Sequence, residues 1–266
     1  MKLLVSTSNA LRHKFVANTV TQHADEALVI AECQPQAASP ESHAGFFPAL
    51  AAHFRLREEA EQAWFAGHDA FRAGTLPVVY GEVNSATVQR VISAWHPELA
   101  IVFGASLIRE PLLSLLPQGR TVNLHLGLSP YYRGSGTNFW PFVNGELEYV
   151  GATLLHLDRG IDSGPIIAHV RPEIARGDTV HTAGCRVIQA GAVALVQAME
   201  IIRRGGMLPR IPQWPVAEAR YYRQNDVTEE VLARYHHNLQ QGLVERYLAR
   251  DERPVQLISL PSEAIA

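Results

Sequence analysis

Cysteine is scarce in this sequence, and no cysteine pair is spaced for a metal or redox site. The two cysteines among the 266 residues are Cys33 and Cys185, and neither belongs to a Cys-x-x-Cys motif. This argues against a disulfide framework and against a zinc knuckle. The pattern predicts two packed or half-exposed thiols and no metal site.

Long apolar runs and a strong charge of one sign are also missing. Residues 1–5 run at once into polar and basic residues, without the apolar core of a signal peptide, and no apolar run reaches membrane-spanning length. The formal net charge of −3 gives no overall attraction for nucleic acid. We therefore expect a cytoplasmic protein with no membrane partner and no nucleic-acid partner.

What the sequence does contain is the make-up of an ordinary globular protein, with 47% apolar and 18% charged residues. Segments with strand character are 2–6, 27–31, 77–80, 99–103, 121–125, 150–157 and 166–170, and segments with helical character are 9–21, 48–73, 85–96, 111–116 and 178–204. The strand–helix–strand opening indicates a parallel sheet. The continuous apolar run at 99–103 is typical of a strand inside such a sheet.

The character of the chain changes at Gly205-Gly206, which ends the last long helix. We expect one domain at 1–204 and an extension at 205–266, made of a proline-rich connector and an amphipathic helix. Asp226 with Glu229 resembles a capping box at the start of that helix. Its apolar stripe consists of Leu232, Tyr235, Leu239, Leu243 and Tyr247. Such a stripe usually packs on its own domain, and a homodimer contact is the alternative.

Three chemically distinct side chains can meet at one site. Asn123 and His125 stand two residues apart on the strand 121–125, so they point to the same face. A later apolar segment returns with Asp162, and Asp158 is a further candidate acid. An amide donor, an imidazole and a carboxylate suit acyl transfer to an amine, which needs a base, a group that holds it and a donor for an oxyanion. Alone, the histidine is better read as a core residue and the aspartate as a turn residue.

An ordered series of motifs between about residue 78 and residue 200 resembles the folate-dependent formyltransferase family. The matching segments are Asn123-Leu124-His125, Leu128–Gly134, Asn144-Gly145, Val150–Thr153 and Asp158–Ile167. Members of this family formylate methionyl-tRNA, glycinamide ribonucleotide or nucleotide-linked amino sugars. With the resemblance we expect an α/β fold, a Rossmann-like and mostly parallel sheet with helices on both faces, and a C-terminal helical extension beyond the catalytic domain.

The resemblance implies 10-formyltetrahydrofolate as the formyl donor and Asn123, His125 and Asp162 as the catalytic residues. The side chains suit these roles. An imidazole takes or relays a proton near neutral pH, a carboxylate orients the ring and stabilises its charged form, and an amide N–H donates to an oxyanion.

The resemblance also places the donor between two loops. The residues it implies are Ala105, Ser106, Leu107, Ile108, His156, Leu157, Asp158, Gly160 and Ile161. Small residues at 104–106 let backbone groups reach a flat heterocycle, and Leu107 and Ile108 supply apolar walls. Without the downstream motifs, residues 104–108 would read as an ordinary strand-to-helix turn.

The acceptor amine is less closely indicated. Arg133 lies in a glycine-bearing loop and either contacts an anionic acceptor or sits on the surface. Ser8 and Arg12 lie near a helix start that can bind an anion, but the glycines that hold the phosphate in glycinamide ribonucleotide formyltransferases are missing there. Residues 205–266 are too short and too helical for the β-barrel of the tRNA enzyme. The stretch 138–140 resembles sugar N-formyltransferases, although aromatic packing explains it as well.

We therefore expect a formyltransferase that acts on a primary amine of a small molecule, with a nucleotide-linked amino sugar as the leading acceptor. Two alternatives are a 10-formyltetrahydrofolate hydrolase and a folate-binding module without turnover. Whether residues 35–75 form a lid over the site is left open.

Overall fold

The structure is a computed structural model that describes residues 1–33, 48–217, 219–250 and 254–261. The strands are β1 (Lys2–Ser8), β2 (Glu26–Cys33), β3 (Gly74–Val79), β4 (Leu99–Phe103), β5 (Thr121–His125), β6 (Tyr132–Gly134), β7 (Ala152–His156), β8 (Ile166–Val170) and β9 (Arg220–Tyr222). The helices are α1 (Leu11–Thr21), α2 (Pro48–Phe65), α3 (Ala86–Trp95), α4 (Leu112–Leu115), α5 (Trp140–Asn144), α6 (Val180–Arg203), α7 (Glu229–Gln240) and α8 (Leu243–Leu248), with 3-10 turns at Leu147–Tyr149 and Gln224–Asp226.

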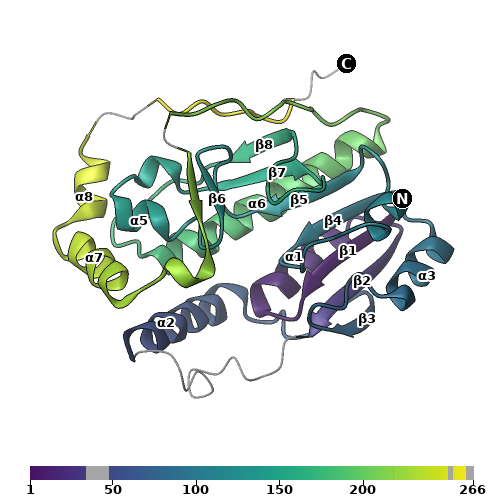
Figure 1. Cartoon of the computed structure of the whole chain (residues 1–266), viewed down its shortest axis with the longest axis horizontal. Helices are drawn as coiled ribbons and strands as arrows, with labels where there is room; N and C mark the ends of the chain where they lie inside the picture. The colour runs from purple at the N-terminus through teal and green to yellow at the C-terminus, as the bar shows by residue number, and fades with distance from the viewer. Residues whose placement is uncertain (34–47, 218, 251–253, 262–266) are drawn as a thin grey trace.

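Seven strands form one sheet in the order β3-β2-β1-β4-β5-β7-β8 (Figure 1). The first five run parallel, whereas β7 is antiparallel to both β5 and β8. The strand order reverses beside β1, so the carboxyl ends of β1 and β4 lie side by side. In open α/β sheets, ligands bind outside the strand ends at such a switch point. The predicted mostly parallel sheet is confirmed.

Helices cover both faces of this sheet, also as predicted. Successive side chains of β1 point to opposite faces. Leu3 and Val5 belong to the larger hydrophobic cluster, which includes residues of α1, α5, α6 and α7. Leu4 belongs to a smaller cluster with Ile92 of α3 and Leu112 of α4. The sheet is therefore buried between two helical layers.

Local sequence signals fix several of the helix ends. Ser85 caps α3 by accepting a hydrogen bond from the backbone N–H of Val88, and Thr179 caps α6 in a capping box with Thr182. The prediction that the helix from residue 48 continues to 73 is wrong. α2 ends at Phe65 because the chain turns at Gly67, whose φ of 85° ends an α-helix. Residues 35–47 of the segment considered as a lid lie outside the described residues.

Helix α6 is, in the described part of the chain, the helix long and apolar enough to cross a membrane. Polar residues interrupt the apolar sequence of α6, so a search for uninterrupted apolar runs does not find this helix. More than half of its most apolar window, 56%, is buried inside the protein, and Val187, Leu195 and Met199 belong to the larger cluster. α6 is therefore a core helix, apolar because it packs against α1, α2 and the sheet.

The C-terminal stripe forms two helices instead of one. α7 ends at Gln240, and α8 starts after Gly242, whose φ is 70°. The predicted capping box at its start is wrong, because Thr228 accepts the N–H of Val231 while Asp226 accepts that of Arg223. The hydroxyl of Thr228, and not the carboxylate of Asp226, therefore caps α7.

Residues after 204 pack closely on the rest of the protein. Leu232, Tyr235 and Leu243 join the larger hydrophobic cluster, so the interpretation of the stripe as a packing face is confirmed. β9 pairs with β6, and Ile258 exchanges hydrogen bonds with His169 of β8. In Figure 1, α7 and α8 lie beside α5 at one end of the molecule. The homodimer contact stays a prediction.

Candidate active site

The structure brings the three predicted side chains together on one carboxylate oxygen. Asn123 Nδ2 donates to Asp162 Oδ1 at 3.3 Å, and His125 Nδ1 lies 3.2 Å from the same oxygen. Asn123 and His125 come from β5, whereas Asp162 comes from the loop between β7 and β8. Because β7 runs antiparallel beside β5, that loop returns along β5. An amide, an imidazole and a carboxylate therefore share one site.

The loop around Asp162 has an unusual backbone that a distant residue holds. Asp162 has a φ of 49°, in the left-handed region that few non-glycine residues adopt. Gln213 Nε2 donates to the carbonyl oxygens of Asp162 at 2.7 Å and of Gly164 at 2.9 Å. Strained conformations persist where surrounding contacts fix them, and they cluster at functional sites. Gln213 is thus a positioning residue that sequence reasoning missed, because it lies in the proline-rich connector.

The Asp162 carboxylate is stabilised in its charged form. Burial raises the pKa of Asp162, but the charge and hydrogen bond of His125, the backbone N–H of Gly134 and the amide of Asn123 together outweigh burial. The pKa of Asp162 therefore lies below its ordinary value. The carboxylate is ionised at neutral pH, as a group that orients an imidazole must be.

Strand β6 supplies two backbone groups to the site. His125 Nε2 lies 3.2 Å from the carbonyl oxygen of Tyr132, and the N–H of Gly134 bonds to Asp162. Gly134 has a φ of 90°, and a Cβ there would meet the carbonyl oxygen of Tyr222 at 2.2 Å. Only glycine fits this backbone against β9. Both ring nitrogens of His125 face oxygen acceptors, and a neutral imidazole has one N–H to donate, so the ring is placed to pass a proton.

The loops implied as the donor site present apolar side chains to solvent. Leu107 is 38% exposed and Ile161 is 51% exposed, which is high for large apolar residues and suits walls that a flat ligand covers. Ile108, by contrast, is buried in the smaller cluster with Ala105 packed against that cluster, so these two support the loop from below. The backbone N–H of Ser106 is held by Glu32 at 2.5 Å.

A cavity of about 460 Å³ adjoins the second of these loops. His156, Leu157 and Asp158, which the resemblance implies as donor-binding residues, line it together with Glu110 and Leu113, which were not predicted. The side chain of Asp158 accepts hydrogen bonds from the Gly160 N–H and the Ser163 hydroxyl, which fixes the turn.

His156 lines this cavity with a neutral ring. Its Nε2 donates to the carbonyl oxygen of Pro209 at 2.9 Å, and burial lowers the pKa of His156, so the ring is neutral. Among the described residues, its buried Nδ1 has no hydrogen-bond partner. An unpaired buried acceptor is costly unless a ligand or water completes it.

Glu32 is a fully buried carboxylate that ties two loops at the carboxyl end of the sheet. It accepts the backbone N–H groups of Gly81 at 2.8 Å and Ser106 at 2.5 Å. Glu32→Ala leaves both groups unpaired, at a cost of roughly 1–3 kcal/mol each in the free energy of unfolding. We expect a clearly lowered melting temperature and weaker folate binding, measured by thermal denaturation and by titration. Glu26→Gln, at the exposed start of β2, is the matched control, and an equal shift there would contradict this role for Glu32.

Two of the three residues implied for the acceptor already have partners within the protein. Ser8 is buried, with its hydroxyl 2.5 Å from His13 Nδ1. Arg12 forms an ion pair with Glu61 of α2 at 2.6 Å. Arg133 differs from both, because its Nε is buried without a hydrogen-bond partner among the described residues. It lies between Tyr132 and Gly134, whose backbone groups reach the catalytic side chains.

The stretch 138–140 packs inside the protein. Asn138 accepts the N–H of Gly151 at 2.8 Å, Phe139 joins the larger cluster, and the ring of Trp140 stacks on Tyr222 at 3.8 Å between centroids. The interpretation as aromatic packing is therefore confirmed, and this stretch gives no direct support to a sugar acceptor.

The comparisons with known proteins identify the family. The family model described as formyl transferase matches residues 17–199. The chain therefore belongs to the formyl transferase family, whose members are enzymes that transfer formyl groups from formyltetrahydrofolate. Among curated relatives, the methionyl-tRNA formyltransferase of Anaeromyxobacter sp. (strain K) is 32% identical over 156 residues, 58% of this chain and 47% of the relative. The chain thus spans about half the length of that relative.

Solved structures share the fold. Phosphoribosylglycinamide formyltransferase from Anaplasma phagocytophilum has a TM-score of 0.56 and 15% identity, covering 84% of this chain and 98% of that one. The formyltransferase PseJ from Anoxybacillus kamchatkensis, solved with UDP-4,6-dideoxy-4-formamido-L-AltNAc and tetrahydrofolate, has a TM-score of 0.51 and 18% identity, covering 92% and 97%. At these identities the likeness shows the Rossmann-like formyltransferase fold, and the acceptor does not follow from it.

Proposed function

We propose that this protein is an N-formyltransferase that transfers the formyl group of 10-formyltetrahydrofolate to a primary amine of a small molecule. The observation that carries the proposal is that the Asn123 amide and the His125 imidazole both approach Oδ1 of the Asp162 carboxylate. A base, the carboxylate that orients it and an amide donor are the groups that amine acylation needs. A binding module without turnover would have no use for a carboxylate held in a left-handed backbone against an imidazole.

Each side chain of the site has a separate task. When bound, 10-formyltetrahydrofolate supplies an activated formyl carbon on N10. His125 takes the proton that the attacking amine must lose and is placed to deliver a proton to the leaving nitrogen. Asp162 holds the ring through Nδ1 and stabilises its protonated form. Asn123 Nδ2 has two N–H groups, so one remains for the formyl oxygen while the other bonds Asp162.

The donor cavity of His156, Leu157 and Asp158 lies along the same loop as Asp162. Leu107 and Ile161 are exposed and cover the apolar faces of the folate ring. Arg210 also lines the cavity and suits the carboxylates of the folate tail. A donor bound in this cavity would lie along the loop that carries Asp162.

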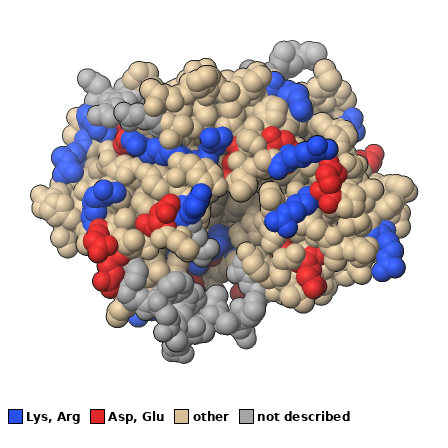
Figure 2. Space-filling model, in the orientation of Figure 1, with Lys and Arg blue, Asp and Glu red and all other residues tan. Residues whose placement is uncertain are grey.

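The acceptor that we propose carries an anionic group close to its amine, as a nucleotide-linked amino sugar does. The supporting observation is Arg133 of β6. Its Nε has no hydrogen-bond partner among the described residues, and its neighbours Tyr132 and Gly134 contact His125 and Asp162 through their backbone groups. Figure 2 shows a hollow near the centre of the face drawn, and several Lys and Arg side chains near it, interspersed with Asp and Glu, would attract an anionic substrate.

An acceptor panel tests the proposal directly. The purified protein is incubated with 10-formyltetrahydrofolate and, separately, nucleotide-linked 3-amino and 4-amino sugars, glycinamide ribonucleotide and methionyl-tRNA. We expect formylated product and tetrahydrofolate in equal amounts with an amino sugar, and neither with His125→Ala. Tetrahydrofolate without a formylated acceptor would instead establish a hydrolase. Product on tRNA alone would refute the small-molecule acceptor.

A further inference from the structure

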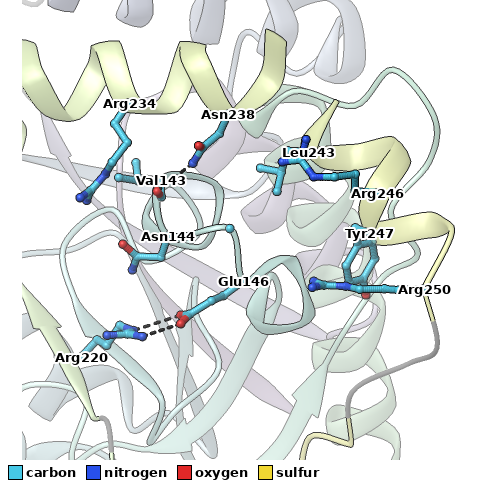
Figure 3. Close-up of a pocket in the computed structure, with 11 residues that line it drawn as sticks. Val143, Asn144, Glu146, Arg220, Arg234, Asn238, Leu243, Arg246, Tyr247 and Arg250 are labelled. Atoms are coloured by element: carbon cyan, nitrogen blue, oxygen red, sulfur yellow. Dashed lines mark hydrogen bonds and ion pairs between the residues drawn. The ribbon is translucent and has the colours of Figure 1, made fainter. Parts of the chain in front are cut away.

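A second cavity, of about 480 Å³, lies away from the catalytic residues, where α5, α7, α8 and β9 meet. Figure 3 shows the side chains of four arginines there: Arg220 from β9, Arg234 from α7, Arg246 from α8, and Arg250, which follows the end of α8. Glu146 is the acidic residue in its lining. The cavity is therefore strongly basic in a protein whose net charge is −3.

Hydrogen bonds between the elements build this cavity in advance. Asn238 of α7 donates to the carbonyl oxygens of Phe142 at 3.0 Å and Val143 at 2.9 Å, which fixes α7 against α5. Arg220 binds Glu146 through two nitrogens, at 3.1 Å and 2.5 Å. A ligand would meet a rigid wall, so little conformational entropy is lost on binding.

The pairing of the arginines leaves positive charge for a ligand. Arg220 is paired with Glu146, and Arg250 with Glu148 at 3.0 Å. Within the described part of the chain, the side chains of Arg234 and Arg246 have no ion pair or hydrogen bond. Two unpaired guanidinium groups that line one cavity repel each other unless an anion lies between them. Guanidinium groups bind phosphate oxygens in pairs and remain charged at any physiological pH.

We propose that this cavity is a binding site for a small polyphosphate anion, such as the diphosphate of a nucleotide. Its volume is in the range of sites for ligands of that size. Arg234 and Arg246 bind the phosphate oxygens, and Tyr247 with Asn144 lines the space beside them. A single phosphate cannot bridge arginines on two helices as well as a diphosphate can, so the longer anion binds more tightly.

This site is distinct from the catalytic one. Tyr132 lies between them, with its backbone carbonyl facing His125 and its hydroxyl donating to Glu146. None of the catalytic or donor-loop residues named above lines the cavity. A ligand here therefore binds together with a folate.

Titration with inorganic pyrophosphate at constant ionic strength tests the site. Wild-type protein is compared with Arg234→Gln/Arg246→Gln and with a control that loses equal charge elsewhere, Arg55→Gln/Arg90→Gln on α2 and α3. Because charge-assisted hydrogen bonds are lost, we expect the Kd of the pocket variant to rise about 10- to 100-fold. The control is expected to keep the wild-type Kd, and sulfate is expected to bind much more weakly than pyrophosphate.

Three outcomes would overturn the proposal. These are no pyrophosphate binding by the wild-type protein, equal weakening in the pocket variant and the control, and displacement of pyrophosphate by saturating 5-formyltetrahydrofolate. Arg234 and Arg246 are exposed, so their removal leaves the core intact, and circular dichroism checks this. The single variants give a second measure, since each should weaken binding by itself. The test needs no acceptor, so it stands apart from the formyl-transfer assay.

Discussion

Replacing His125 by alanine is expected to lower kcat for formyl transfer by about 10²- to 10⁴-fold, the usual contribution of a positioned acid–base group. His125 is the imidazole in contact with Asp162, and the β5 backbone that carries it is held by pairing with β4 and β7. The variant should therefore fold and keep its donor cavity, which lies along another loop. Steady-state kinetics and titration with 5-formyltetrahydrofolate measure the two effects separately.

His237→Ala is the matched control for this prediction, because His237 is an exposed histidine on α7. It should leave kcat and folate affinity unchanged. A His125→Ala variant that kept most of its turnover would show that another group moves the proton. A parallel loss of folate affinity and kcat would make His125 a structural residue of the core.

The proposed catalytic residues could be found in the sequence because their signal is local. Asn123 and His125 face the same way on any strand, and a buried strand was evident from the apolar run around them. The carboxylate could be found only through its own motif, Asp162-Ser163-Gly164, with the spacing of the whole series behind it. The parallel sheet was predictable for the same reason, since each strand and helix carries its pattern within a few residues.

What supports the catalytic residues was not predictable, because it depends on contacts between distant segments. Gln213 reaches Asp162 across 51 residues, and Glu32 reaches Ser106 across 74. Neither residue stands in a motif, and Glu32 lies just beyond the strand predicted at 27–31. Arg12 shows the same limit, since its charge near a helix start suggested a ligand but pairs with Glu61. Local sequence patterns indicate the proposed reacting side chains, whereas the residues that position them are identified only from contacts in the folded structure.

The second large effect is expected at Asp162. In Asp162→Asn, one carboxylate oxygen becomes an N–H donor, although Asn123, His125 and the Gly134 N–H all approach as donors. The amide cannot accept from all of them, and it no longer stabilises a protonated imidazole. We expect kcat to fall about 10²-fold or more, with little change in folate affinity.

The pH dependence separates this role from a merely structural one. The pKa of Asp162 is lowered below its ordinary value, so the carboxylate is ionised through the whole neutral range. Raising the pH therefore cannot rescue the variant, and its loss of kcat should be constant across that range. The stability gained from the lowered pKa is present above the unfolded-state pKa and disappears as the pH falls through the folded-state value, so wild type and variant should converge in stability only in acid.

Asp158→Asn is the informative comparison, because Asp158 lies on the same loop but lines the donor cavity. Its loss should raise the KM for the donor more than it lowers kcat. The reverse pattern, with kcat lost at Asp158 and donor affinity lost at Asp162, would exchange the two roles. A loss at Asp162 that grows as the pH rises through neutrality would mean that the wild-type carboxylate titrates in that range. Its three donors would then not be stabilising its charge.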